Sequence, residues 1–358
     1  MVPRSTTYKF TMTSPTLIFG GATIGQNFPT ASSVQALLDL LKHHQITHID
    51  TAARYPPGKF GLSETLLGEV QAAEQGFSIS TKIFTNPAAG NGEGELSLEA
   101  IESSLAGSLG RLKVKQVDIL YCHRPDPETP LLEQAAALDS QYRKGAFRRL
   151  GLSNYSPKQV RDFVRVCEEN GFVKPTVYQG DYNLVTRGME SELLPTLKEL
   201  KLNFYAFRPL AAGFLTGTYT LEPQPEAPSQ TRFSSTNPLG KFFQNLYGDP
   251  QLHEAMAELK GILAPLGISS RSAALRWICW HSALEGAVAR NEDMKVMENP
   301  EEKLGGGGGG DAIILGASRL EQISENVGSI GEGKLPEQVV ESIEKIWTIL
   351  KESRGAIL

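Results

Sequence analysis

The sequence predicts an α/β fold, a (β/α)8 TIM barrel with a long lid loop after the seventh strand and a C-terminal helix. Eight short apolar segments alternate along the chain with longer segments whose apolar residues recur at helical spacing. This alternation implies parallel strands joined by right-handed crossovers. An open doubly wound sheet would satisfy the same alternation, but the number of strands and the regular spacing of the first six units favour the closed barrel.

The candidate strands are short apolar runs that alternate with the helical segments. In a closed barrel their carboxyl ends share one mouth, where function is expected. In chain order they are Leu17–Gly20, His48–Asp50, Ser78–Lys82, Val117–Cys122, Arg148–Ser153, Thr176–Gln179, Asn203–Phe207 and Ala312–Leu315.

A helical pattern follows each strand. The first helix, Ser32–His44, carries a valine and three leucines at helical spacing, and the second, Ser63–Gln75, opens with Ser63 as its expected N-cap. The remaining helices are expected at Ser97–Leu112, Thr129–Lys144, Ser156–Asn170, Glu190–Leu200, Pro250–Leu263, Ser270–Leu284, Leu320–Ile330 and Pro336–Ser353.

Two segments interrupt the alternation. Pro209–Asp249 is rich in Pro, Gly and Ser, and its aromatic residues indicate a lid. Glu285–Asp311 combines many charges with the glycine run Gly305–Gly310, which predicts a disordered insertion, although it could fold over the loop after the eighth strand. These segments and the chain ends absorb the length beyond a barrel of about 250 residues. We therefore expect the 358 residues to form one domain with a core at about 16–330.

Composition excludes several classes of protein. The formal net charge of −5 leaves no basic surplus for binding nucleic acid, and no apolar run reaches the length of about 18 residues that spans a membrane. The isolated cysteines Cys122, Cys167 and Cys279 form no CxxC pair, so neither a metal site nor a disulfide framework is expected. The N-terminus has no apolar leader, which predicts a cytoplasmic protein.

Polar residues stand at the ends of three adjacent strands, namely Asp50, Tyr55, Lys82 and His123. Singly, each could be a cap, a loop residue or a solvent-facing side chain, but together they suit the reduction of a carbonyl group. A tyrosine hydroxyl has a pKa of about 10, and a neighbouring ammonium such as Lys82 would lower it. Asp50 would hold the lysine in place, and neutral His123 could donate a second hydrogen bond to the carbonyl oxygen.

Motifs of other enzyme classes are incomplete. Tyr55 and Lys59 have the Tyr-x-x-x-Lys spacing of short-chain dehydrogenases, but the prolines between them forbid the helix which that pair needs. Gly20–Gly25 lacks the Rossmann glycine pattern, and Gly305–Gly310 lacks the Lys-Ser/Thr of a phosphate loop. The segment around Ser153 lacks the second glycine of a serine hydrolase elbow.

Six motifs resemble those of the aldo-keto reductases and occur in the same order: DTAARY, STKIF, ILYCHRPD, GLSNY, VYQGDYN and ILGASRLEQISEN. The likeness extends from about Leu17 to Ile330, and the segments LRWICWHSAL and FYAFRPLAAGFLTG are similar to the aflatoxin-aldehyde reductase branch. This resemblance implies NADP(H)-dependent reduction of an aldehyde or ketone by direct hydride transfer. It implies Tyr55 as the proton donor, assisted by the other three residues of the set.

The same resemblance implies binding residues for the cofactor and the substrate. A serine and an arginine at a helix N-terminus also suit the 2′-phosphate of NADPH on physical grounds. The residues implied for the nicotinamide end are Asp50, Ser153, Asn154, Gln179 and Phe207, and those for the pyrophosphate are Arg208, Pro209, Leu210, Gly213, Leu215 and Gly217. The residues implied for the adenosine end are Ser318, Arg319, Gln322 and Asn326. Those implied for the substrate are His123 and Arg232.

Two classes of function remain open from the sequence. The chain is either an enzyme or a non-catalytic NADPH-binding barrel that senses redox state or regulates a partner. Arg208 departs from the family, which usually has Asn or Ser after the stacking aromatic. Phe28, Tyr55, His123 and the aromatic lid indicate a moderately large apolar carbonyl substrate, in detoxification or in specialised-metabolite synthesis. We expect a monomer or a homodimer.

Overall fold

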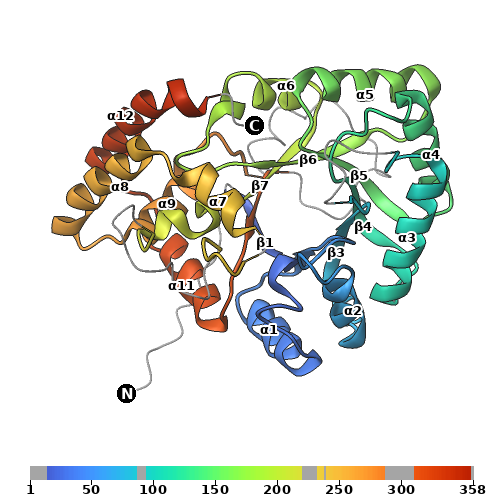
Figure 1. The fold of residues 1–358 in the computed structure, drawn as a ribbon, viewed down its shortest axis with the longest axis horizontal. Helices are drawn as coiled ribbons and strands as arrows, with labels where there is room; N and C mark the ends of the chain where they lie inside the picture. Colours follow the sequence, from blue (N-terminus) through green and yellow to red (C-terminus); the bar gives the residue numbers. More distant parts are fainter. Residues whose placement is uncertain (1–13, 87–93, 220–231, 238, 287–309, 356–358) are drawn as a thin grey trace.

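Eight parallel strands close into a barrel in the computed structural model, which describes residues 14–86, 94–219, 232–237, 239–286 and 310–355 (Figure 1). β8 pairs with β1, with Leu17 beside Ile313, so the ring is closed and the open doubly wound sheet is excluded. The strands are β1 (Thr16–Gly20), β2 (His48–Asp50), β3 (Ser78–Lys82), β4 (Val117–Cys122), β5 (Phe147–Ser153), β6 (Pro175–Asp181), β7 (Asn203–Phe207) and β8 (Ala312–Leu315).

Helices surround the barrel (Figure 1). Several begin at a side-chain cap that the sequence provides: Thr30 and Ser33 form a capping box, and so do Ser156 and Gln159. The helices predicted from the sequence appear as α1 (Ala31–His43), α2 (Leu62–Glu69), α3 (Leu98–Leu112), α4 (Leu131–Arg143), α5 (Pro157–Asn170), α6 (Leu193–Glu199), α8 (Pro250–Leu263), α9 (Ser270–Trp280), α11 (Leu320–Gly331) and α12 (Glu337–Arg354).

The start of α2 differs from its prediction. The N-cap is Gly61 in a left-handed conformation, and no side chain caps the helix. Ser63 is instead the second residue of α2, is fully buried, and directs its hydroxyl away from the helix terminus to Gly21 and Thr51. The helix also ends at Glu69, earlier than the predicted Gln75. Its N-terminal turn is therefore held by tertiary contacts.

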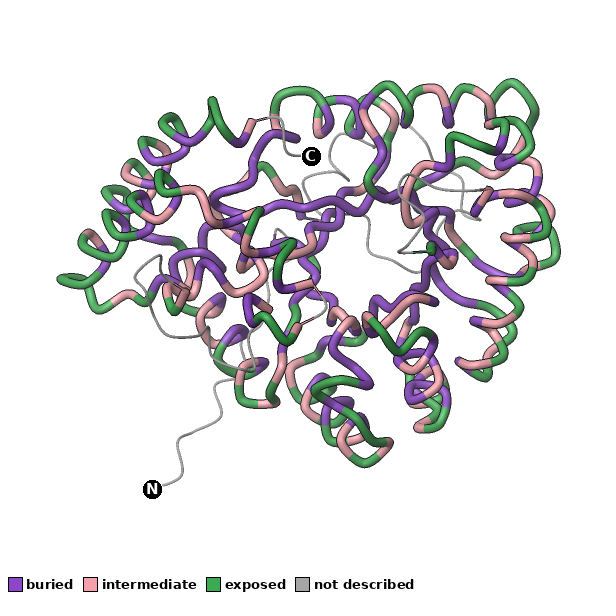
Figure 2. The backbone as a smooth tube through the Cα atoms, viewed as in Figure 1, coloured by how far each residue is buried: buried purple, intermediate pink, exposed green. Residues whose placement is uncertain are grey.

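The core has two layers, separated by the strands. Side chains that point into the barrel form a small cluster that includes Ile18, Tyr121 and Tyr205, whereas a much larger cluster fills the space between strands and helices. In Figure 2 most strand residues are buried, and the helices around them expose their outer surfaces. Gly151 makes room for the inner layer, because a Cβ atom there would lie 2.3 Å from the ring of Tyr121.

A charged group fills the amino-terminal end of the barrel. Arg149 Nη2 lies 2.7 Å from Asp118 Oδ2, both side chains are almost wholly buried, and Arg149 Nη1 donates to the Tyr205 hydroxyl at 3.3 Å. A buried guanidinium needs such partners to offset the loss of its hydration. This end of the barrel is therefore closed, and the chemistry is left to the opposite mouth.

The connection from β7 to α8 is more ordered than the lid loop that the sequence predicts. It contains the 3-10 segment η3 (Ala211–Thr216) and a helix, α7 (Gly240–Tyr247), while residues 220–231 lie outside the described part. Its aromatic rings pack on one another, with Tyr219 stacked on Phe233 at 4.2 Å between centroids. The C-terminal end of α7 is fixed by Arg354 of α12, which donates a hydrogen bond to the carbonyl of Leu246 at 3.0 Å.

The two residues that flank the charged, glycine-rich segment before β8 lie next to each other. The Asp311 amide donates to the carbonyl of Glu285 at 2.8 Å, and the Glu285 amide donates to the Asp311 carboxylate at 2.8 Å. Asp311 also accepts from Phe204 at the start of β7. Both ends thus lie at the amino-terminal end of β8, whereas Ser318 follows its carboxyl end. The sequence predicts disorder for Glu285–Asp311; its two end residues are instead held by these hydrogen bonds, and residues 287–309 lie outside the described residues.

Among the described residues, no helix is long and apolar enough to cross a membrane. The three cysteines are buried as free thiols, and within the same ranges no group of His, Cys, Asp and Glu side chains has the arrangement of a metal site.

Candidate active site

A buried ion pair lies at the mouth of the barrel. Asp50 ends β2 and Lys82 ends β3, so the two parallel strands bring their side chains together. Lys82 Nζ lies 2.6 Å from Asp50 Oδ2 and 2.8 Å from Oδ1, and it donates to the Thr51 carbonyl at 2.9 Å. Lys82 is 1% exposed. These oxygens offset the hydration that an ammonium loses when it is buried.

Two tyrosine rings border the Lys82 ammonium. Its nitrogen lies 5.2 Å from the centroid of Tyr55, in the loop after β2, and 5.4 Å from that of Tyr121 on β4. Tyr55 in turn meets His123 edge to face, with centroids 5.9 Å apart. The structure thus brings together the four residues that the sequence selects. Tyr121 is missed by sequence reasoning, although its position two residues before His123 on an alternating strand could have indicated an inward side chain.

His123 is poised as a neutral hydrogen-bond donor. Burial, reinforced by the nearby cations Lys82, Arg54 and Arg124, holds the pKa of its imidazole well below 6.5. Its Nδ1 atom is buried and has no hydrogen-bond partner among the described residues. The backbone of His123 is fixed by Asn154, whose side-chain amide donates to the His123 carbonyl at 2.8 Å.

The expected nicotinamide-binding residues lie beside the ion pair. The Gln179 side-chain amide donates to Asp50 Oδ1 at 2.9 Å, which orients it across the barrel mouth. Asn154 adopts a left-handed conformation with φ of 63°, and its side chain also donates to the Ser153 hydroxyl at 3.1 Å. Ser153 and Gln179 are buried and Asn154 is exposed, so these polar groups form one edge of the mouth.

Arg208, the departure from the family pattern, has a partner that sequence reasoning missed. Its Nη1 atom lies 3.1 Å from Asp181 Oδ2, and its guanidinium stands over the Phe207 ring at 4.8 Å and the Phe243 ring at 5.8 Å. Burial raises the pKa of Asp181, and Arg208 opposes that rise. An Asp and an Arg at the carboxyl ends of the neighbouring strands β6 and β7 are the signal that could have predicted this pair.

The segment from Arg208 to Gly217 turns sharply, because Arg208, Ala211, Ala212, Gly213 and Gly217 all have positive φ angles. This conformation lays the backbone along the rim between β7 and α9. Pro209 and Leu215 are buried, and Leu210 packs against the core. If this segment contacts a pyrophosphate, as the sequence predicts, its backbone and Arg208 are the groups available for that contact.

The expected adenosine-binding residues stand at the start of α11. Arg319 is the exposed N-cap residue, and Ser318 donates its amide and its hydroxyl to Gln322 Oε1 at 2.8 and 3.1 Å. Asn326 is buried, and its Oδ1 atom has no hydrogen-bond partner among the described residues. An exposed guanidinium, a helix N-terminus and a buried amide oxygen are groups that can bind a phosphate and a base.

Arg232 is half-buried near the same mouth. Its guanidinium lies 5.9 Å from the Phe243 ring, and burial together with Arg208 lowers its pKa. No carboxylate among the described residues lies within ion-pair distance of it. Phe28, which the sequence assigned to substrate binding, is instead buried in the outer core against Phe19, with ring centroids 6.4 Å apart.

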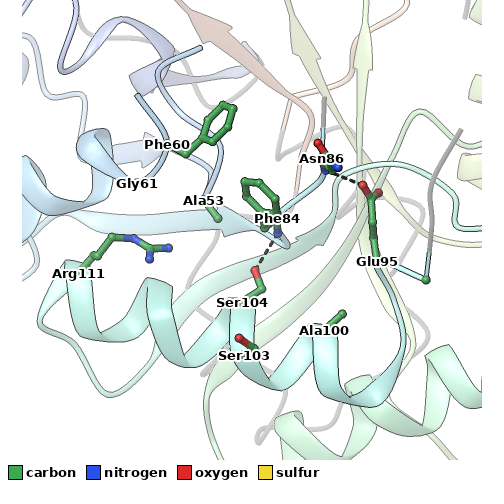
Figure 3. Close-up of a pocket in the computed structure, with 11 residues that line it drawn as sticks. Ala53, Phe60, Gly61, Phe84, Asn86, Glu95, Ala100, Ser103, Ser104 and Arg111 are labelled. Carbon is green, nitrogen blue, oxygen red and sulfur yellow. Dashed lines mark hydrogen bonds between the residues drawn. The ribbon is translucent and has the colours of Figure 1, made fainter. Parts of the chain in front are cut away.

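A separate cavity of about 470 Å³ lies beside this mouth, between α3 and the loops after β2 and β3 (Figure 3). Phe60 and Phe84 meet edge to face on one side, and Ser104 accepts a hydrogen bond from the Phe84 amide at 2.7 Å. None of the residues selected from the sequence lines it.

Several known proteins are similar to this chain in sequence over most of its length. The profile of the Aldo/keto reductase family matches residues 16–348. The human aflatoxin B1 aldehyde reductase member 2 is 35% identical over 345 residues, which are 93% of this chain and 86% of the human protein. An aldo-keto reductase of Pseudocercospora fijiensis is 33% identical, with 88% of this chain and 97% of that protein covered. The oxidoreductase sirO of Leptosphaeria maculans is 31% identical, with 96% and 97% covered.

The closed barrel, the grouping of Asp50, Tyr55, Lys82 and His123 at its mouth, and a family match over nearly the whole length agree with one another. The chain belongs to the aldo/keto reductase family.

Proposed function

We propose that this protein reduces an aldehyde or ketone to the alcohol with NADPH, using Tyr55 as the proton donor. The observation that carries the proposal is the buried Lys82–Asp50 pair, whose ammonium faces the Tyr55 ring at 5.2 Å. Family membership supports an oxidoreductase that acts on carbonyl compounds. The human relative is an aflatoxin B1 aldehyde reductase, which supports an aldehyde as the substrate.

The proton comes from the Tyr55 hydroxyl in this mechanism. The nicotinamide of NADPH, when bound, supplies the hydride to the carbonyl carbon. As negative charge grows on the carbonyl oxygen, Tyr55 donates its proton, and the Lys82 ammonium stabilises the phenolate that forms. Asp50 fixes Lys82, so the charge is in place before the reaction begins.

His123 contributes a second hydrogen bond to the same oxygen. Because its pKa is held well below 6.5, the imidazole is neutral at physiological pH and carries one N–H donor. A neutral donor stabilises the developing oxyanion without competing with Tyr55 for the role of acid. The edge-to-face contact of the two rings supports this pairing of His123 with Tyr55.

The cofactor would be held along the rim from β5 to α11. Ser153, Asn154 and Gln179 offer polar groups for the carboxamide, and Phe207 offers a ring face for the nicotinamide. At the other end, the exposed Arg319 at the N-terminus of α11 favours the additional phosphate of NADPH over NADH. On the substrate side, Arg232 would contact the part of the substrate that projects from the mouth.

A non-catalytic NADPH-binding barrel is the alternative, and the Tyr55→Phe variant separates the two. We expect Tyr55→Phe to lower kcat for aromatic aldehydes by at least about a hundredfold, because the acid is removed while its ring stays. NADPH oxidation measures the rate, and quenching of intrinsic fluorescence measures NADPH binding, which we expect to be unchanged. An unchanged rate in Tyr55→Phe contradicts the mechanism, and absence of turnover in the parent protein with a broad carbonyl panel favours the alternative.

A further inference from the structure

Ser63 lies behind the catalytic residues and joins three segments of the mouth. Its hydroxyl donates to the Gly21 carbonyl, after β1, at 3.0 Å and lies 2.8 Å from the Thr51 hydroxyl, after β2. Since the single proton of Ser63 is engaged by Gly21, the Thr51 hydroxyl donates to Ser63. Ser63 and Thr51 are both fully buried, so neither hydrogen bond can be replaced by water.

The same residue reaches the loop of the proton donor through its backbone. The Ser63 amide donates to the Tyr55 carbonyl at 3.2 Å. The first amides of a helix have no partner within the helix, so the Tyr55 carbonyl satisfies one of those of α2. Thr51 in turn offers its carbonyl to the Lys82 ammonium at 2.9 Å. Ser63 is thus one hydrogen bond from the Tyr55 backbone and two from the Lys82 ammonium.

The next residue keeps Ser63 in place. Glu64 is fully buried, accepts from the Thr81 hydroxyl, and receives Arg111 Nε at 2.8 Å. Thr81 directly precedes Lys82 on β3, and Arg111 belongs to α3. The start of α2 is therefore fixed to the strand that carries the lysine, and Ser63 transmits that fixed position to the loop that carries Tyr55.

We propose that Ser63 is a positioning residue that sets the place of Tyr55 relative to the Lys82 ammonium. The inference rests on the proposed function, because it assigns Ser63 an effect on proton donation by Tyr55. No atom of Ser63 contacts either reacting group, and it acts through Thr51, Gly21 and the Tyr55 backbone.

The pH dependence of turnover reports this positioning. Reduction requires the protonated phenol, so kcat falls as pH rises through the pKa of the acid. A Lys82 ammonium held close stabilises the phenolate relative to the phenol. When Ser63 no longer fixes the loop, the attraction weakens, and the basic limb of the kcat profile moves to higher pH. At neutral pH the weaker, displaced acid gives a smaller kcat.

The experiment compares Ser63→Ala and Thr51→Val with a control, Ser104→Ala, which removes a half-buried hydroxyl of α3 that accepts a hydrogen bond from the Phe84 amide, outside the site. For Ser63→Ala we expect kcat to fall about tenfold or more, since small displacements of reacting groups are costly. The basic limb should move up by roughly half a pH unit or more, with NADPH affinity within about twofold. Thr51→Val should shift the limb in the same direction, and Ser104→Ala should not shift it.

The double variant Ser63→Ala/Thr51→Val provides an internal check. Because the two hydroxyls act through one hydrogen bond, the double variant should lose hardly more activity than Ser63→Ala alone.

A purely structural role predicts a different result. Ser63→Ala would then lower the Tm while leaving the basic limb and kcat as in the parent protein, and this outcome overturns the inference. If Ser63→Ala fails to fold, Thr51→Val decides the question, and an unmoved limb overturns the inference again. The Tyr55→Phe variant is measured in parallel: if it retains turnover, the proposed function fails, whereas a failure confined to the Ser63 series leaves that function intact.

Discussion

His123 shows how one residue can couple the site to stability. Its pKa is held well below 6.5 in the folded protein, by burial first and by neighbouring cations second, whereas in the unfolded chain it is close to 6.5. As pH falls below 6.5, the His123 imidazole therefore binds a proton in the unfolded state but not in the folded state. Stability contributed by the neutral imidazole is present above the unfolded pKa and is lost below it.

We therefore expect the free energy of unfolding to fall as pH decreases from 6.5, and to fall less steeply in His123→Gln. One proton changes this slope by at most about 1.4 kcal/mol per pH unit. Urea denaturation at a series of pH values measures it. An equal slope in His123→Gln would show that His123 is not held neutral.

Among single residues, the sequence allowed the four that meet at the mouth to be predicted, but not the residues that hold them in place. Asp50, Lys82 and His123 stand at strand ends, where position alone indicates function. Tyr121 and Ser63 contact the set only because the strands close and α2 docks. Asp181 becomes informative only beside Arg208. Contacts of this kind depend on tertiary structure, which periodicity does not contain.

The N-terminus of α11 offers a test of cofactor choice at the scale of one element. Arg319 is exposed at the N-cap position, next to the first amides of the helix, and both carry positive charge or partial charge. We expect Arg319→Met to weaken NADPH binding about tenfold, since a hydrogen bond to a charged group contributes about 1.5–3 kcal/mol. NADH binding should stay within about twofold, because that cofactor lacks the phosphate.

Fluorescence titration with both cofactors measures the two constants. Arg165→Met, on the exposed face of α5, serves as the control and should change neither. If Arg319→Met weakened the binding of NADPH and NADH equally, Arg319 would not contact the 2′-phosphate.

The regular elements could be predicted because each has a strong local signal. The strands and most helices lie within a few residues of their predictions, since their apolar residues follow one period. α7 was missed because it is short and lies among Pro, Gly and Ser residues that are typical of a loop. It is stabilised by contacts that no local pattern predicts, including the hydrogen bond from Arg354 to Leu246.

At the scale of the whole molecule, the segment before β8 can be tested by removal. Glu285 and Asp311 are joined by backbone and side-chain hydrogen bonds at the end of the barrel opposite the mouth. We expect that replacing residues 287–309 by a short Gly-Ser linker leaves kcat/KM and NADPH affinity within about twofold, because the ends are already adjacent. Steady-state kinetics and fluorescence titration measure both quantities.

Asp311→Ala in the parent chain is the counterpart of this deletion. It breaks the contacts with Glu285 and Phe204 while leaving the segment present, and we expect it to lower the Tm. A shortened chain that loses NADPH affinity would show that residues 287–309 act at the adenosine end after all.

The pairing of β1 with β8 also dictates an order of events during synthesis. Leu17 and Ile313 are partners in the sheet, yet almost the whole barrel separates them along the chain. During synthesis, the edges of β1 and β7 that pair with β8 therefore stay unpaired until β8 emerges from the ribosome. Open strand edges invite association with other chains, and contacts between distant residues form slowly. The nascent protein should consequently depend on chaperones most strongly just before Ala312–Leu315 is translated.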